Sequence, residues 1–286
     1  MKLLCRILPL LAALLFAPAR GGAQIISVAD EHVSVDSVRR SFADQHYYFG
    51  LYKDNYFIFG CPVGYRPTRA NSDVKFQVSV AQKLTKATLP LGTYLYLYYT
   101  QKVFWSVLEN SMPMTDLNFN PGIGLAKPIF VKDRFVGKVT LTLEHESNGR
   151  DSIQSRSWNK VSFGGSVMID PNLMVYGKFW IPIIDGQNNR DILRYCGLFQ
   201  LGWDWRSTNR RVGASLNLVK RKAHFFKGMF DWNVTAEFSW RLSKSANQFL
   251  FVQYYNGYGE GLLDYNKWHS MLRVGIVIKP TLFSEF

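Results

Sequence analysis

The chain has little cysteine and no long apolar run beyond its first residues. Three of its 286 residues are cysteines, and two of these, Cys61 and Cys196, lie beyond the N-terminal leader. Neither has neighbours at metal-ligand spacing, so no zinc site is predicted. We interpret the two as independent, partly buried side chains. Beyond the leader, the sequence also lacks the stretch of about 20 apolar residues that a transmembrane helix needs.

The N-terminus has the pattern of a cleavable secretory signal. Lys2 and Arg6 accompany the apolar run 8–16, and small residues follow up to Ala23. The apolar run is too short for an anchor helix. We therefore predict a signal peptide at 1–23, a polar N-terminal segment at 24–46 that is mobile or plugs the interior, and one folded domain at 47–286.

The charge is strongly basic, but no nucleic-acid-binding motif accompanies it. The formal charge is +13, which becomes +10 when the three basic residues of the leader are subtracted. Because a secreted chain rarely meets nucleic acid, no nucleic-acid partner is predicted. Attraction to anionic lipid surfaces and a merely solvated basic surface both fit this balance.

Aromatic residues make up 15% of the chain, and apolar and polar residues alternate along most of it. The clearest segment, 232–242, has Trp, Val, Ala, Phe, Trp and Leu on one face and polar residues on the other. Such period-two alternation is typical of strands. About twelve segments follow this pattern, beginning near Tyr47, Val74, Gly92, Asn118, Gly137, Ser157, Leu173, Leu193, Arg210, Asp231, Gln248 and Ser270.

An even number of strands about ten residues long, with many aromatics, predicts an all-β, antiparallel transmembrane β-barrel of about 12 strands. Its place would be the outer membrane of a Gram-negative bacterium, and the terminal Phe286 is familiar from such barrels. Pro121 and Pro128 predict that the fourth strand is irregular or short. A soluble β-sandwich also alternates, but the signal peptide, strand number and aromatic content favour the barrel.

One predicted hairpin carries polar residues on its apolar face. His145 and Ser147 continue the face of Val139, Leu141 and Leu143, and Asn159 lies on the matching face of the return strand. If Ser147 opposes Ser157, His145 lies opposite Asn159, within hydrogen-bond reach. This arrangement predicts Ser147 as nucleophile, His145 as general base and Asn159 as the residue that orients the imidazole. The simpler alternative is a set of ordinary polar residues at a strand end.

The segment from His145 to Asn159 resembles the active-site segment of the bacterial outer-membrane phospholipase A family, whose pattern is H-x-S-N-G-R, a short loop, then S-R-S-W-N. The stretches 74–77, 99–102, 256–260 and 264–266 are similar to other parts of that family. No Gly-x-Ser-x-Gly elbow of an α/β-hydrolase occurs. The resemblance implies a calcium-dependent phospholipase A1/A2 that hydrolyses acyl esters of glycerophospholipids and lysophospholipids, with His145, Ser147 and Asn159 as its triad.

The resemblance implies further roles outside the triad. It implies an oxyanion-hole N–H at Gly149, Ca²⁺ ligands at Arg150, Ser155 and, from a partner subunit, Ser111, and a dimer contact at Gln101, so that activity would need a homodimer. The chain departs from the family at Glu146, which stands where glutamine is expected, in the loop 151–154, whose acid is placed differently, and at Asn188. Glu146 is assigned no catalytic role, and Asn188 stands where an acidic residue serves a secondary calcium site, which we do not carry over. A non-enzymatic pore or structural barrel and a lipid A-modifying enzyme remain the alternatives.

Overall fold

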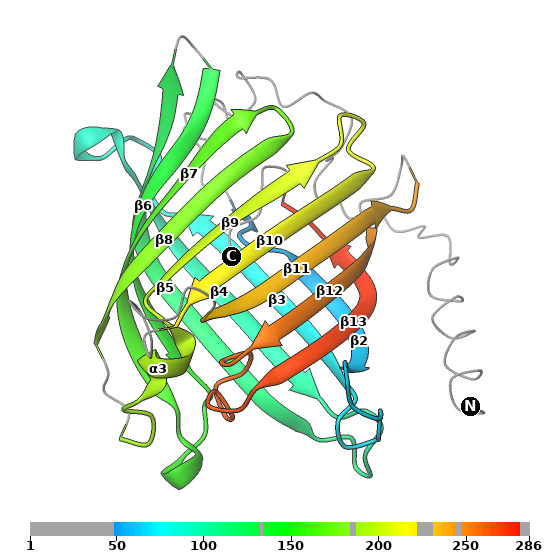
Figure 1. Ribbon diagram of the computed structural model, residues 1–286. Coiled ribbons are helices and arrows are strands. Elements are labelled where there is room, and N and C mark those ends of the chain that lie inside the picture. Colours follow the sequence, from blue (N-terminus) through cyan, green and yellow to red (C-terminus); the bar gives the residue numbers. More distant parts are fainter. Residues whose placement is uncertain (1–48, 132–133, 184–186, 222–230, 244–247, 281–286) are drawn as a thin grey trace.

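The computed structural model describes residues 49–131, 134–183, 187–221, 231–243 and 248–280. The predicted signal peptide, the segment 24–46 and Phe286 lie outside these ranges. The described chain is almost entirely β-sheet, wound into a closed, tilted barrel (Figure 1).

Twelve long antiparallel strands form the barrel wall, which confirms the predicted fold class. Each strand pairs with its neighbours in sequence, and β13 closes the ring by pairing with β2. The strands are β2 (Asn55–Pro62), β3 (Asp73–Lys83), β4 (Tyr94–Trp105), β5 (Met114–Val131), β6 (Arg134–Ser147), β7 (Ser157–Asp170), β8 (Leu173–Ile183), β9 (Phe199–Arg206), β10 (Val212–Lys220), β11 (Trp232–Arg241), β12 (Phe249–Gly257) and β13 (His269–Ile278). A short strand, β1 (Phe49–Leu51), extends the wall beside β3.

The alternation read from the sequence becomes an apolar outside and a polar inside. Large apolar side chains such as Leu143, Phe179 and Trp240 are more than half exposed on the outer wall. Lys75, Glu237 and Arg273 are buried in the interior, where Arg273 binds Asp73 and Glu260. A water-soluble fold would reverse these two faces, so the outer wall is built to contact lipid.

None of the described helices is long and apolar enough to cross a membrane.

Two predicted strands differ from the structure near their starts. The first is interrupted, because residues 52–54 separate β1 from β2, and the side chain of Asn55 accepts a hydrogen bond from the Ser79 N–H across the break. The strand predicted near Leu193 begins at Phe199, since residues Ile192–Cys196 form a short helix, α3. Gly197, with φ of 77°, ends that helix in a conformation that favours glycine.

The fourth strand, predicted to be irregular or short, is irregular but not short. Strand β5 runs for 18 residues and is the longest described. Its prolines are accommodated at local irregularities, because the ladder to β6 has a gap at Asn120 and Pro121 and a register shift follows Pro128. Beside the gap, the Asn120 side chain donates to the carbonyl of His145 at 2.9 Å and replaces a bond that Pro121 cannot form.

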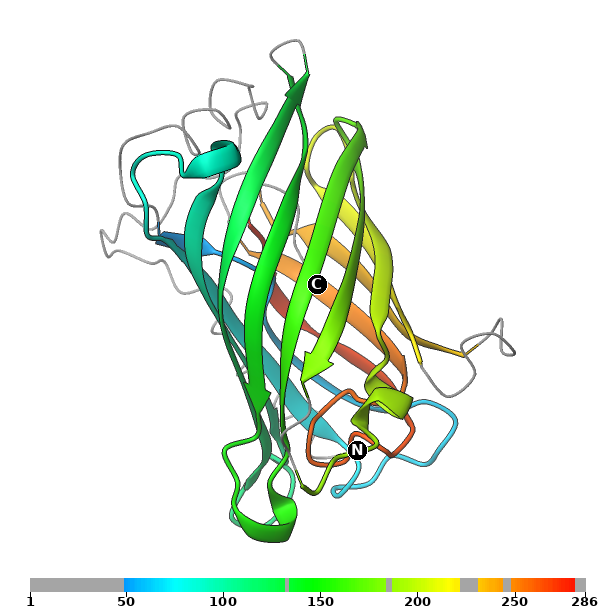
Figure 2. The same ribbon diagram turned by 90° about the vertical axis from the view of Figure 1, so that its left-hand side faces the viewer.

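The two ends of the barrel carry connections of different length. At the end where β6 passes into β7, the connections are 63–72, 106–113, 148–156, 184–198, 221–231 and 258–268. Apart from 84–93, those at the other end are shorter: 132–133, 171–172, 207–211 and 242–248. In outer-membrane barrels the longer loops face the cell exterior. The loop of the β6–β7 hairpin, at the lower end of Figure 2, therefore lies on the outer side of the membrane.

Candidate active site on the outer wall

The end of the β6–β7 hairpin brings His145 and Asn159 together on the outer wall. The register pairs His145 with Asn159 and Ser147 with Ser157, as the sequence analysis assumed. The His145 Nδ1 atom lies 2.8 Å from the Asn159 Oδ1 atom, within hydrogen-bond distance. An N–H at Nδ1 donating to this oxygen leaves Nε2 as the free base.

Ser147 lies two residues beyond His145 on the same face of β6. It is the last residue of the strand and half-buried. Its hydroxyl forms no hydrogen bond with any residue in the described ranges. A serine–histidine contact commonly tightens only when substrate binds. The geometry therefore sets up the histidine–asparagine pair and leaves the serine hydroxyl open toward the membrane.

The loop between the two strands is organised by Asn148, a residue that was not predicted from the sequence. Asn148 is 2% exposed. Its Oδ1 accepts hydrogen bonds from the N–H groups of Arg150 and Arg156, at 3.3 and 3.0 Å, and its Nδ2 donates to the Gln154 carbonyl at 2.8 Å. The Asn148 side chain thus connects the beginning of the loop, at Arg150, with its end, at Gln154 and Arg156.

Gly149 turns the chain just after Ser147. It has φ of 63°, and a Cβ atom there would lie 2.8 Å from the Phe119 ring, so both conformation and space favour glycine. Within the described part of the chain its N–H donates to no acceptor. An open N–H next to a candidate nucleophile is what an oxyanion hole requires.

Replacing Asn148 with Ala is expected to lower ester hydrolysis about 10- to 100-fold while the barrel stays folded, since small displacements of reacting groups cost this much. The measurement is the initial rate of fatty-acid release by variant and parent protein. The matched control is Asn172→Ala at the opposite end of the barrel, where the Asn172 side chain binds Thr208. Equal rates for both variants and the parent would contradict this role.

The predicted calcium ligands supply oxygen atoms only. No group of three or more His, Cys, Asp or Glu side chains that could hold a metal ion occurs among the described residues. Neither the Ser155 hydroxyl nor the Arg150 carbonyl takes part in a hydrogen bond within the described ranges. Both lie on the loop beside Ser147, and hard carbonyl and hydroxyl oxygens suit Ca²⁺. The donor set therefore fits calcium chemically, although two ligands leave it incomplete.

The third predicted ligand, Ser111, lies on the neighbouring connection 106–113. Ser111 and Met112 both have positive φ, at 66° and 41°, which costs residues other than glycine roughly 1–3 kcal/mol each. Both side chains are exposed. The Arg150 guanidinium ties its own loop to the start of β5, just after this connection, because its Nη2 atom donates to the Thr115 carbonyl at 2.6 Å.

Gln101 is a polar residue within the apolar outer wall. Cross-strand pairing places it in one row with Val78, Phe119 and Ser147, two strands from the candidate nucleophile. Its side-chain oxygen accepts a hydrogen bond from the Tyr99 hydroxyl at 3.0 Å. A polar side chain facing lipid is rare and usually has a role.

The connection 184–198 holds the start of β7, a contact that the sequence did not suggest. The Asn189 side chain is fully buried and binds both the N–H and the carbonyl of Ser157, at 3.3 and 2.9 Å. The Asn188 side chain donates to the Ser152 carbonyl at 2.7 Å. At the position where the resemblance implies an acidic residue, this chain thus has an amide that donates directly to the loop between β6 and β7.

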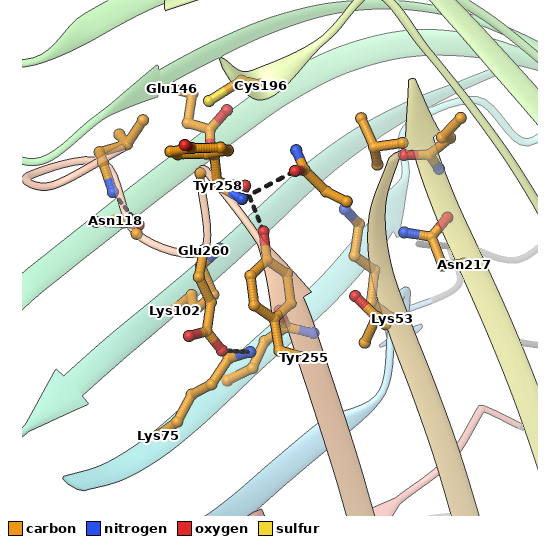
Figure 3. Close-up of a pocket in the computed structure, with 18 of the residues that line it drawn as sticks. Lys53, Lys75, Lys102, Asn118, Glu146, Cys196, Asn217, Tyr255, Tyr258 and Glu260 are labelled. Atoms are coloured by element: carbon orange, nitrogen blue, oxygen red, sulfur yellow. Dashed lines mark hydrogen bonds and ion pairs between the residues drawn. The ribbon is translucent and has the colours of Figure 1, made fainter. Parts of the chain in front are cut away.

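A polar cavity of about 230 Å³ lies inside the barrel (Figure 3). It is lined by charged side chains, among them Lys75, Lys102, Glu146 and Glu260. Lys75 binds Glu260 at 3.0 Å. Because His145, Ser147 and Asn159 lie on the other side of the wall, this cavity is separate from the candidate active site.

The two free cysteines do not pair, in agreement with the interpretation from sequence.

Comparison with known proteins identifies a matching family and related sequences. The model of the phospholipase A1 family matches residues 61–278. Phospholipase A1 of Escherichia coli (strain K12) is 32% identical over 216 residues, covering 72% of this chain and 69% of that protein.

Two solved structures share the fold. An active-site asparagine-to-alanine mutant of the E. coli outer membrane phospholipase A matches with a TM-score of 0.71 and 25% identity, covering 89% of this chain and 100% of that one. The calcium-bound dimer of the Salmonella typhi outer membrane phospholipase matches with a TM-score of 0.72 and 24% identity, covering 86% of this chain and 98% of that one.

Proposed function

Because the chain belongs to the phospholipase A1 family, we propose that it hydrolyses acyl ester bonds of glycerophospholipids and lysophospholipids in the outer membrane, with Ser147 as nucleophile. The observation that carries this proposal is the 2.8 Å contact between His145 Nδ1 and Asn159 Oδ1, next to Ser147 on the lipid-facing wall. Ester carbonyls of phospholipids lie at the headgroup boundary. A nucleophile at the end of a membrane-spanning strand meets them there.

The residues of this chain would divide the acyl transfer among them. The Ser147 hydroxyl attacks the ester carbonyl while His145 Nε2 takes its proton, and the same proton then passes to the leaving alcohol. Asn159 holds the imidazole through Nδ1, and the Gly149 N–H donates to the developing oxyanion. Water, activated by His145, then releases the fatty acid from Ser147. The E. coli active-site mutant, in which an asparagine is replaced by alanine, supports an asparagine in a site of this kind.

Calcium would be held by the Arg150 carbonyl and the Ser155 hydroxyl, and it would supply positive charge that stabilises negative charge on the substrate. The Salmonella relative contains calcium, and the two oxygen atoms of this chain are open to accept a cation. The strained residues Ser111 and Met112 would present the Ser111 carbonyl to a partner subunit. The active species would therefore be a homodimer, and the Salmonella structure is a calcium-bound dimer.

The test of this function is fatty-acid release from mixed phospholipid micelles by the refolded barrel, with calcium and with chelator. A pore or structural barrel would release none, and a lipid A-modifying enzyme would consume lipid A instead.

Gln101→Leu is expected to weaken dimerisation about threefold, because a polar contact between membrane-spanning segments contributes roughly 0.6 kcal/mol. Sedimentation of the calcium-loaded protein in detergent measures the dimer fraction. Leu201→Ala is the control, since Leu201 is exposed on β9, away from β4. A Gln101→Leu protein that dimerises as the parent does would remove Gln101 from the proposed interface.

A further inference from the structure

The lumen face behind the candidate triad carries a cluster of charged and aromatic side chains. Because side chains alternate along a strand, the pair His145 and Asn159 on the outer wall is flanked by two cross-strand pairs that point inward. These are Glu144 with Lys160, and Glu146 with Trp158. Glu146 lies between His145 and Ser147 in sequence, and Figure 3 shows it at the lumen cavity.

Glu146 binds both inward residues of the opposite strand. Its Oε2 atom accepts a hydrogen bond from the Trp158 indole N–H at 3.0 Å and from the Lys160 ammonium group at 2.9 Å. The same ammonium group lies 4.4 Å from the centre of the Trp158 ring. Trp158 and Lys160 are the two sequence neighbours of Asn159, so one carboxylate fixes the strand on both sides of that residue.

The remaining contacts tie this cluster to the rest of the barrel. Trp158 is 2% exposed and packs with Trp180, Ile192, Leu262 and Tyr265. Lys160 also lies 3.9 Å from Glu144, which binds Lys178 on β8. The cluster thus connects β6, β7 and β8 with the loops that close this end of the barrel.

The position of the triad explains why such support is needed. His145 and Ser147 are within the last three residues of β6, and Asn159 is within the first three of β7. Strand ends open locally more easily than strand centres. The contact between His145 and Asn159 is a hydrogen bond between neutral groups, whereas the bond from Lys160 to Glu146 joins charged groups and is stronger.

We propose that Glu146 is a positioning residue, and that Glu146, Trp158 and Lys160 form a lumen-side brace that keeps Asn159 bound to His145. The inference rests on the proposed serine hydrolase function. Glu146 would not contact substrate, because the barrel wall separates it from the lipid. Side chains in the lumen would therefore affect the rate of the reaction on the outer wall by positioning Asn159.

The experiment measures the rate at which a fluorophosphonate, a covalent label for activated serines, reacts with Ser147 in the refolded full chain. Glu146→Gln keeps the size of the side chain but removes the charge that holds Lys160. It is expected to slow labelling about 10-fold, because a slightly misplaced catalytic group has effects of this size. It should lower kcat for ester hydrolysis by a similar factor and leave KM unchanged.

The double variant separates positioning from general destabilisation. In an Asn159→Ala background, the added Glu146→Gln substitution should change labelling less than twofold, since the brace acts through Asn159. Glu237→Gln is the matched control: Glu237 is a buried lumen carboxylate on β11 that binds Ser215 and Gln253. Its labelling rate should equal that of the parent. Electrophoresis in detergent without heating verifies the folding of each variant, because a folded barrel stays compact under these conditions.

Three results would overturn the brace. One is parent-like labelling of a folded Glu146→Gln protein, and another is an equal loss in the Asn159→Ala background. A third is the same loss in Glu237→Gln, which would indicate a general need for lumen charge. A parent protein that is not labelled at all would instead overturn the proposed function, and the brace with it.

Discussion

Ser147→Ala is expected to reduce fatty-acid release from phospholipid micelles on the order of 10⁴-fold or more, because removal of a nucleophile eliminates the acyl-enzyme route. The substituted position is half-buried at a strand end, and the parent hydroxyl has no hydrogen-bond partner among the described residues. The barrel should therefore fold and dimerise as before. Release is measured with parent and variant at the same calcium concentration.

Ser157→Ala is the matched control for this experiment. Ser157 lies directly opposite Ser147 in the neighbouring strand, and alanine keeps the backbone atoms that bind Asn189. Its variant should keep activity within a few-fold of the parent. If Ser147→Ala retained parent activity, the nucleophile would be another residue. A folded, dimeric parent that releases no fatty acid under any condition would favour a pore or structural role.

The barrel was predictable because lipid and lumen impose opposite polarity on the two faces of each strand. In β11 the sequence alternates Phe238 and Trp240 with Glu237 and Ser239, and the structure exposes the first pair and buries the second. Ladder closure follows from this pattern, since an open sheet edge is unstable in a membrane. Sequential pairing of the strands then leaves one simple topology.

The departures arise where tertiary contacts overrule a local signal. Proline should disrupt a central strand, yet β5 continues through Pro121 because the neighbouring Asn120 side chain donates to the His145 carbonyl instead. In the same way the apolar start of the predicted eighth strand, near Leu193, folds into α3, and this helix joins the cluster around Trp158 and Tyr265. In both cases the contacting residues are far apart in the sequence, so a local pattern could not indicate them.

The residues of the candidate site also differ in how far the sequence could predict them. Period-two spacing and one assumed register predict that His145, Ser147 and Asn159 share a face, and the pairing of β6 and β7 reproduces that register. Their roles as a triad came from the family resemblance. Asn148 and Asn189 could not be found this way, because their value lies in hydrogen bonds to backbone groups of other loop residues. Glu146 was likewise given no role, since its partners become visible only when the lumen face is assembled.

Activity is expected to depend on calcium, so excess chelator should lower the rate about 10²- to 10³-fold, the usual effect of losing one group that stabilises an oxyanion. Ser155→Ala should raise the calcium concentration for half-maximal activity about 10-fold, which corresponds to roughly 1.4 kcal/mol of binding free energy. The rate of fatty-acid release is measured across a calcium titration for parent and variant.

Ser152→Ala distinguishes a calcium ligand from a loop effect. Ser152 lies three residues earlier in the same loop, is exposed, and directs its hydroxyl to Asp151. Its variant should titrate with calcium as the parent does. Parallel shifts for Ser152→Ala and Ser155→Ala would mean that the loop conformation, and not the Ser155 hydroxyl, sets the affinity. Full activity in chelator would mean that the Gly149 N–H stabilises the oxyanion without the cation, and the open oxygen atoms of Arg150 and Ser155 would then need another explanation.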